Sequence, residues 1–490
     1  MAATLPRIQM PVPAEAHRDS DRLDPGIWKV SAVVLLGPFM TNLDSTVVNV
    51  SLSTLARELH ASLSSIQWVV SGYLLALALM LPMSGWLVDR IGAKRVYLGC
   101  FTAFTIASVF CGTAHSSDAL IACRVVQGMA GGLLSPMAQM MIARVAGRQM
   151  ARVLGFTVMP ILISPILGPV IAGEVLQHGS WRWLFFLNLP IGVLAVALAS
   201  VLLPKDESTR QPRRFDLKGF LLLSPGLVAM LYGLEHAMEG SGRISLGLGV
   251  LLLGGFLVYA KRMGAAALVD LELFSSPVFS AAAMLQFLSN AMIFSGQMLL
   301  PLYLISVCHF STEKTGAVVM SLGLGMLCSY PFMGMLTERF GCRPVSSSGS
   351  LIAFAGTLLI AWMAWRGVDT PVLCAALFLR GMGMGAIGIP TISAAYSSVP
   401  KERLPIATTT INIVQRIGGP IGTTLFAIFL GFCAQQLHLS GAPTFAAAFL
   451  LLAVIHASNF FCALRLPMRV HDTQAEKRLV KLETVGAQAE

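Results

Sequence analysis

The chain has 490 residues, of which 55% are hydrophobic and only 12% are charged. A soluble globular domain carries roughly 25% charged residues, so this chain cannot cover a water-facing surface. The composition therefore excludes a soluble protein and predicts a membrane protein with many spans. The formal net charge of +10 would suit a nucleic-acid partner. The positions of the basic residues along the chain explain that charge without such a partner.

Residues 1–27 form a polar, proline-containing segment without the apolar core of a cleavable signal peptide, so we expect a cytoplasmic N-terminal tail. After this tail, apolar stretches of the roughly 20 residues that a bilayer requires recur fourteen times. The expected spans are 28–55, 64–88, 95–114, 118–143, 150–177, 182–203, 216–236, 244–263, 278–307, 314–337, 345–364, 371–398, 404–432 and 444–465.

Basic residues are distributed unevenly between the two sets of loops. With the N-terminus placed in the cytoplasm, the inner loops and their edges hold 17 lysines and arginines, against 5 on the outer side. Because basic loops stay on the cytoplasmic side, we expect both termini inside the cell. The nine cysteines are scattered without a C-x-x-C pair, which predicts buried apolar side chains rather than a metal site or disulfides.

Three patterns recur about 250 residues apart. The segment GWLVDRIGAKR (85–95) matches GMLTERFGCRP (334–344), IACRVVQGMAGG around Arg124 resembles LFLRGMGMGAIG around Arg380, and Gly168-Pro169 resembles Gly419-Pro420. A repeat of this length indicates two homologous bundles. We expect an all-α membrane protein with two pseudo-symmetric six-helix bundles, 28–203 and 278–465. A linker and an extra helix pair (204–277) lie between them, and a cytoplasmic tail (466–490) follows.

Asp44 lies inside the first apolar span, in the stretch FMTNLDSTVVNVSLS (39–53). A carboxylate in hydrocarbon costs several kcal/mol unless it is paired, hydrated or protonated. Helical spacing places Asn42, Thr46 and Asn49 on one stripe, nearly opposite Asp44, and that stripe is a candidate cavity lining. Two interpretations of Asp44 stay open. It is either a proton carrier or a structural acid paired with a helix dipole or a buried arginine.

Arg124 is charged under all conditions and begins a later span. The residues Gly128, Gly131, Ser135 and Gln139 follow at helical spacing, so this face is small and polar and another helix can approach it closely. A fixed cation near a protonatable acid could switch the pKa of that acid, whereas the alternative is an arginine that only reaches the membrane interface. Arg380 and Arg416 are weaker copies in the second bundle.

The fifth span carries SPILGPVIAGEVL (164–176), in which Ser164, Gly168 and Ala172 form a ridge of small residues. Such a ridge allows tight helix contact, and Pro169 bends the helix by removing a backbone donor. Glu174 lies about one turn from the outer end of this span. It is a candidate second proton site, with simple contact to interfacial water as the alternative.

A charged loop closes the second span. We expect it to form a gate at the cytoplasmic face, through charge pairs and a tight glycine turn made by Gly85, Asp89, Arg90, Gly92, Lys94 and Arg95. Simple anchoring by positive charge explains the basic residues of this loop but not its acid and glycines.

These motifs together resemble the major facilitator superfamily. GWLVDRIGAKR is similar to its signature loop between the second and third helices, RVVQGMAGG to its fourth-helix motif, and LGPVIAG to its antiporter motif, with Ala172 where glycine is more usual. LDSTVVNVSLS, SWRWLFFLNLPIG and fourteen spans point to the fourteen-span drug:proton antiporter branch. The resemblance implies a proton-coupling role for Asp44 and Arg124, and a bundle contact at Gly168, Pro169 and Gly173. We add Gln127 of the fourth-helix motif to the candidate cavity lining.

The sequence therefore predicts a proton-coupled antiporter that exports amphipathic small molecules from a bacterium across its inner membrane. Export of an endogenous metabolite or a metal chelate is the alternative in the same fold, and a non-transporting receptor is another. No P-loop, H-E-x-x-H or G-x-S-x-G motif indicates an enzyme. We expect no cofactor, a proton gradient as the energy source, and the lipid bilayer and a small molecule as partners. A periplasmic adaptor, an outer-membrane channel and the oligomeric state are left open.

Overall fold

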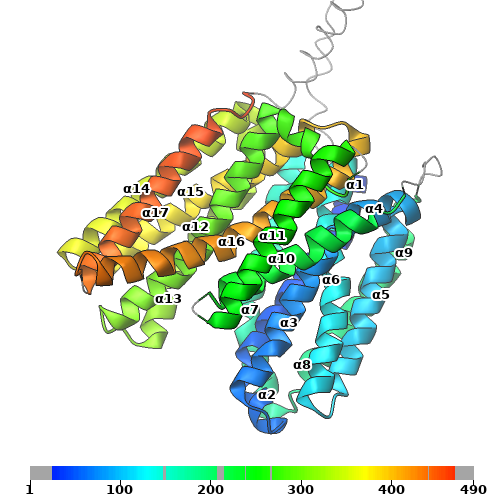
Figure 1. The fold of residues 1–490 in the computed structure, drawn as a ribbon, viewed down its shortest axis with the longest axis horizontal. Helices are drawn as coiled ribbons and strands as arrows, with labels where there is room; N and C mark the ends of the chain where they lie inside the picture. Colours follow the sequence, from blue (N-terminus) through cyan, green and yellow to red (C-terminus); the bar gives the residue numbers. More distant parts are fainter. Residues whose placement is uncertain are drawn as a thin grey trace, which may run out of the picture.

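The structure is a computed structural model, and it describes residues 25–146, 150–206, 214–237, 239–264, 267–439 and 441–468. Most of the two predicted tails, residues 1–24 and 469–490, lies outside these ranges. Residues 207–213 of the predicted linker lie outside them as well. Over the described residues the chain forms seventeen α-helices and two short 3₁₀ turns (Figure 1).

The first half of the chain contributes nine helices. They are α1 (Pro25–Val50), α2 (Leu52–Glu58), α3 (Leu63–Met80), α4 (Met83–Ile91), α5 (Ala93–Gly112), α6 (Ser117–Ala146), α7 (Met150–His178), α8 (Trp183–Phe186) and α9 (Asn188–Leu202). The second bundle is built from α12 (Pro277–Ser306), α13 (Thr312–Phe340), α14 (Cys342–Arg366), α15 (Thr370–Ser397), α16 (Leu404–Gln435) and α17 (Ala442–Ala463). The turns η5 (Leu271–Ser275) and η6 (Lys401–Arg403) precede α12 and α16.

Thirteen helices of the described part are long and apolar enough to cross a membrane. The fifth expected span, 150–177, coincides with the 29-residue helix α7, which is not among the thirteen. The number of fourteen spans therefore stays a prediction. The chain is a multi-pass membrane protein by this measure. In a long α-helix most backbone N–H and C=O groups are hydrogen-bonded within the helix itself, which is what a lipid bilayer without water requires.

Three expected spans are each divided into two helices. The first breaks at Ser51, whose hydroxyl donates to the Val47 carbonyl at 2.7 Å, because a serine that bonds back to the preceding turn disturbs the helical ladder. The second breaks before Pro82, which has no backbone N–H to donate. The sixth is divided at Leu187, between α8 and α9.

The repeat seen in the sequence has a structural counterpart at its glycines. Gly92 and Gly341 both have positive φ angles, +102° and +92°, and they precede α5 and α14 respectively. Since side chains rarely adopt such angles, glycine is required at both turns. The helices before these turns, α4 and α13, are also equivalent because each packs on a helix of the other bundle. α4 packs on α16 of the other bundle, and α13 packs on α7.

The buried cores show how the two bundles meet. We call the end of the molecule that carries Gly92 and Gly341 the gate end, and the opposite end the far end. One large core cluster at the gate end joins both bundles, for example Val34 and Met137 of the first with Tyr330 and Ile389 of the second. At the far end the cores are separate, one for each bundle. Among the described residues, the large core that both bundles share therefore lies at the gate end.

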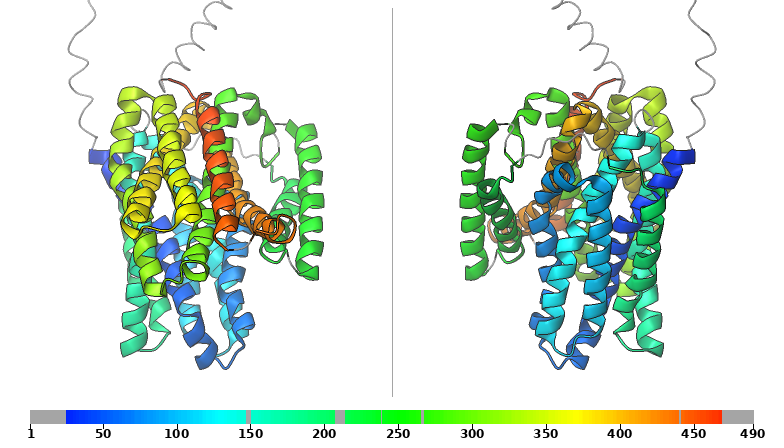
Figure 2. Two further views of the ribbon diagram at one scale, coloured as in Figure 1. Left: turned by 90° about the vertical axis from the view of Figure 1, so that its left-hand side faces the viewer. Right: turned by 90° about the vertical axis from the view of Figure 1, so that its right-hand side faces the viewer.

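The helices α10 (Leu217–Glu235) and α11 (Gly240–Met263) form a hairpin on one flank of the bundles (Figure 2). α10 contacts α3 of the first bundle and α16 of the second. The Tyr232 ring stacks on Trp68 with centroids 5.8 Å apart, and Ser71 donates to the Glu235 carboxylate at 3.3 Å. The Leu234 carbonyl accepts from Thr424 of α16 at 3.1 Å. The hairpin thus contacts both bundles.

Candidate functional site

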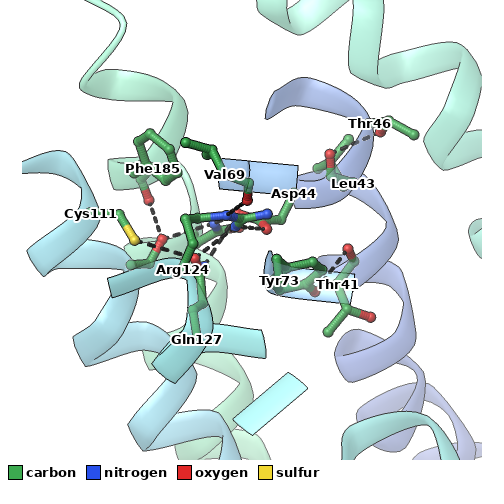
Figure 3. A network of polar contacts seen from close by, with 12 residues as sticks. Thr41, Leu43, Asp44, Thr46, Val69, Tyr73, Cys111, Arg124, Gln127 and Phe185 are labelled. Carbon is green, nitrogen blue, oxygen red and sulfur yellow. Dashed lines mark hydrogen bonds and ion pairs between the residues drawn. The ribbon is translucent and has the colours of Figure 1, made fainter. Parts of the chain in front are cut away.

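Asp44 and Arg124 form an ion pair inside the first bundle (Figure 3). Arg124 Nη1 lies 2.5 Å from Asp44 Oδ2, and both side chains are fully buried. The other carboxylate oxygen accepts from Asn188 Nδ2 at 2.7 Å and from Gln127 Nε2 at 3.3 Å. The carboxylate therefore has donors on α6 and α9, which is the environment that a buried anion requires.

The Arg124 guanidinium is held by three further groups. Nε donates to the Val69 carbonyl at 3.2 Å, and Nη1 also donates to Gln127 Oε1 at 2.7 Å. The Tyr73 ring lies under the cation, with 4.0 Å between the guanidinium carbon and the ring centroid. Nη2 has no hydrogen-bond partner among the described residues. The alternative of an arginine that only reaches the membrane interface was wrong, since Arg124 is completely enclosed.

The glycines after Arg124 explain how it reaches this position. A β-carbon at Gly128 would overlap the Tyr73 carbonyl, and one at Gly132 would overlap the Leu77 carbonyl. α6 can therefore approach α3 backbone to backbone, as the small face of the fourth-helix motif predicts. This close approach brings Arg124 between α3 and α1, within reach of Asp44.

The network is sealed from solvent in this conformation. Leu43, Val47, Cys111 and Phe185 belong to the far-end core of the first bundle and surround it. A buried pair of this kind is electrically neutral as a unit, but either charge alone would be uncompensated. The pair is compatible with both interpretations of Asp44, so its role as a proton carrier stays a prediction.

Several candidate residues lie away from this network. Glu174 is exposed near the end of α7, where it contacts His178 Nδ1 at 3.2 Å. Asn42 and Asn49 are exposed on the stripe that faces away from Asp44, whereas Thr46 is half-buried under α7. The placement of Gln127 in a cavity lining was wrong. Its side chain is fully buried because it bonds both members of the ion pair.

The α7 motif makes its closest contact within its own bundle. A β-carbon at Gly168 would overlap Thr46 of α1, so this glycine lets α7 lie tightly against α1. Pro169 is exposed, and a β-carbon at Gly173 would meet nothing within 4 Å. In this conformation the expectation that these residues meet the second bundle was wrong. Gly155, near the start of α7, contacts the second bundle instead. A β-carbon at Gly155 would lie 2.8 Å from the Tyr330 carbonyl of α13.

The gate loop joins the bundles through its first glycine. A β-carbon at Gly85 would lie 3.3 Å from Thr409 Oγ1 and 3.4 Å from the Pro405 carbonyl of α16. The neighbouring Ser84 hydroxyl is hydrogen-bonded to Thr409 at 2.6 Å. Gly334, the repeat partner of Gly85, packs in the same way on α7, where a β-carbon would overlap the backbone of Arg152.

The charged part of the gate loop contacts backbone as well as side chains. Asp206 accepts from the backbone N–H of Lys94 at 3.0 Å and of Arg95 at 3.3 Å. The Lys94 ammonium donates to the Ser200 and Leu203 carbonyls at 2.6 and 2.8 Å, so it caps the end of α9 instead of pairing with an acid as expected. Arg90 lies over the Trp86 ring at 5.7 Å, and Asp89 lines a small pocket with Arg214 and Asp216.

A further polar contact between the bundles was not predicted. Gln139 Oε1 of α6 accepts from Tyr396 Oη of α15 and from Asn412 Nδ2 of α16, both at 3.0 Å. Gln139 belongs to the polar face identified from the sequence, but its partners lie more than 250 residues away. Asn188 was also missed, although a lone asparagine in the apolar segment SWRWLFFLNLPIG is a signal of a buried polar contact.

Two helical bundles that share a core at one end and enclose a buried acid–cation pair are typical of a membrane transporter. The chain belongs to the major facilitator superfamily, whose model matches residues 34–423. This is a family of secondary transporters and not of enzymes.

Curated relatives and solved structures support the same assignment. The chain is 33% identical to the Mycobacterium tuberculosis H37Rv "Multidrug resistance protein B homolog" over 84% of its own length and 78% of that protein. It is 31% identical to "Putative multidrug resistance protein MdtD" of Klebsiella pneumoniae over 83% of this chain and 87% of that one. The fold is similar to the human organic anion transporter MFSD10, with a TM-score of 0.62 at 16% identity and coverage of 90% and 100%. The fold is also similar to the proton:xylose symporter XylE, with a TM-score of 0.60 at 15% sequence identity. That comparison covers 88% of this chain and 95% of XylE.

Proposed function

We propose that this transporter is a proton-coupled antiporter that exports amphipathic small molecules, with Asp44 as the proton carrier. The observation that carries the proposal is the fully buried Asp44–Arg124 pair in the first bundle. The names of the relatives, which are multidrug resistance proteins, support the substrate class. The bias of basic residues supports a cytoplasmic location of the gate end.

The packing supports an outward-facing state. The gate-end core joins the bundles, whereas their far-end cores are separate. If the gate end is cytoplasmic, the cytoplasmic side is closed and the opposite side is the one that can open. Asp44 belongs to the half of the bundle near the far-end core, so a proton from outside has the shorter path to it.

Protonation of Asp44 supplies the driving force for the change of state. It removes the negative partner of Arg124, and a buried charge without its partner costs about 3–5 kcal/mol. The cost falls in any conformation that gives the guanidinium water or another acceptor. A shift from 1:99 to 99:1 between two states needs about 5.5 kcal/mol, so the broken pair supplies most of it. Substrate bound to the other state contributes through its own differential affinity.

Transport in proteoliposomes with an imposed pH gradient tests this proposal. Wild-type protein should move a lipophilic dye against its gradient when protons flow the other way. Asp44→Asn, which keeps the shape of the side chain and removes its charge, should abolish that movement while the protein elutes as a folded species. Glu313→Gln, at an exposed site near the start of α13, should transport normally. Proton-driven transport that persists unchanged in the Asp44→Asn variant would refute the assignment.

A panel of substrates separates drug export from export of one metabolite or metal chelate. Transport of several unrelated lipophilic cations and dyes supports the proposed substrate class. Activity toward a single polar compound would overturn it and would leave the coupling residues to be judged by the Asp44 variant alone.

A further inference from the structure

The second bundle buries an arginine that has no acidic partner among the described residues. Arg380 of α15 is the repeat counterpart of Arg124, and its side chain is completely enclosed. Its Nη2 donates to the Met292 carbonyl at 3.1 Å, whereas Nε and Nη1 have no hydrogen-bond partner in the described part of the chain. Arg416, the other expected copy, is only half-buried.

Other buried polar groups on neighbouring helices are unsatisfied in the same way. His456 of α17 is fully buried, and neither ring nitrogen has a partner among the described residues. The Ser295 hydroxyl of α12 is likewise buried without one. Phe279, near the start of α12, and Ala463, at the end of α17, share the gate-end core, so these two helices run antiparallel. The bond from Asn459 to Ser289 therefore places His456, one turn earlier on α17, at the level of the Met292 carbonyl that Arg380 binds. Asn459, one turn after His456, leaves its carbonyl oxygen unbonded while its amide nitrogen donates to Ser289 at 3.4 Å.

Glycines bring this cluster together. A β-carbon at Gly296 would overlap the Arg380 guanidinium, so the cation lies directly against the backbone of α12. A β-carbon at Gly422 of α16 would lie 2.8 Å from Ser295 Oγ. The guanidinium therefore lies against Gly296, the residue that follows Ser295, and a glycine packs on the Ser295 hydroxyl as well.

The two bundles thus treat equivalent cations differently. In the first, α1 supplies Asp44 and the pair is neutral. In the second, α12 supplies the Met292 carbonyl and the Gly296 backbone against the guanidinium, and no described carboxylate pairs with it. An arginine cannot lose its charge in a protein, and an isolated buried charge costs several kcal/mol. Buried polar groups are normally hydrogen-bonded, so several orphaned donors in one place indicate a ligand.

We propose that the second bundle binds a small monovalent anion, of the size of chloride, through Arg380, His456 and Ser295. Guanidinium, imidazole and hydroxyl hydrogens are the donors that such an anion accepts. Water would satisfy these hydrogens but would leave the charge of Arg380 uncompensated. A larger organic acid does not fit the complete burial of all three side chains. Asn459 contributes an acceptor and does not belong to the ligands.

Thermal unfolding of the purified full-length protein in detergent tests this site without any transport assay. The probe is sodium chloride against sodium gluconate at equal ionic strength. Wild-type protein should show a saturable rise in Tm with chloride, because a ligand that binds only the folded state stabilises it. Bromide should act like chloride. Arg380→Gln should lose the rise, and Arg366→Gln, at an exposed position on α14, should keep it.

Two outcomes overturn the proposal: equal Tm values of the wild type in chloride and gluconate, or an undiminished chloride response in Arg380→Gln. If that variant does not fold, Gly296→Ala decides, since the added β-carbon displaces the guanidinium but keeps its charge. It should weaken the apparent chloride affinity by at least tenfold, and an unchanged affinity refutes the site. The chloride result does not depend on the role of Asp44. If Asp44→Asn still transports and the proposed proton carrier is refuted, the test of the anion site stands unchanged.

Discussion

The energetic coupling between Asp44 and Arg124 can be measured with a double-mutant cycle. Asp44→Asn leaves the guanidinium buried without an anion, and Arg124→Gln leaves the carboxylate buried without a cation. Breaking a buried pair by removing one partner costs about 3–5 kcal/mol. Both side chains have 0% exposure, so solvent does not screen the interaction and the full range applies.

The double variant removes both charges and should therefore cost less than the two single variants together. Neighbours within one network show coupling energies of about 0.5–3 kcal/mol, and the 2.5 Å contact with shared bonds to Gln127 places this pair at the upper end. We expect a coupling of about 2–3 kcal/mol.

Unfolding by denaturing detergent, followed by the loss of helical circular dichroism at neutral pH, gives the free energies for the four proteins. Glu174→Gln serves as the control and should change stability by less than about 0.5 kcal/mol, because the Glu174 side chain is 74% exposed. Additive effects of the two substitutions, within about 0.5 kcal/mol, would show that the pair is not an energetic unit and would refute the reasoning.

Three further substitutions test the gate end. Gly334→Ala should disfavour the closed gate, since its β-carbon would overlap the Arg152 backbone, and more labelling of cysteines introduced at the gate end would report this. Gly92→Ala should lower the stability by at least about 1 kcal/mol, because φ is +102° and the new β-carbon would overlap the Asp206 carboxylate; the Tm measures it. Tyr396→Phe removes one inter-bundle hydrogen bond and should cost about 1 kcal/mol, measured by detergent unfolding.

Matched controls accompany these variants. Gly323→Ala on the same helix as Gly334 meets nothing within 4 Å and should leave labelling unchanged. Gly264→Ala also has a positive φ but no neighbour within 4 Å, so it isolates backbone strain from the clash at Gly92. Equal effects of the Gly92 and Gly264 substitutions would contradict a role for Asp206. If the Tyr396→Phe variant is as stable as the wild type, the hydrogen bond from Tyr396 to Gln139 does not stabilise the contact between the bundles.

Apolar stretches and the repeated motifs were sufficient to predict an all-helical membrane protein with the fold of this family. The breaks at Ser51 and before Pro82 were missed because the hydropathy of the chain continues across them, although the local backbone chemistry does not. Gly85 and Gly92 were recognised from their repeat, and both are required by close packing or by a positive φ.

Side-chain partners across the bundles were harder to predict. Asp44 needed a buried counter-charge, and Arg124 was the strongest candidate, so the sequence pointed to this pair. Gln127 was assigned to a cavity because helical spacing defines a face but not what covers that face. Gln139 and its donors belong to different bundles, and their register depends on how the halves dock, which no local pattern encodes.

The hairpin is anchored to both bundles through adjacent residues. Leu234 accepts from Thr424 of the second bundle, and Glu235 accepts from Ser71 of the first. Any rotation that separates α3 from α16 must break one of these two bonds or carry α10 with one half. At the seam between α7 and α13, the described helices pack on each other directly, without a bridging hairpin. A transporter with nearly symmetric halves therefore carries an additional restraint on one flank, and its opening should be asymmetric, with the flank that carries the hairpin separating last.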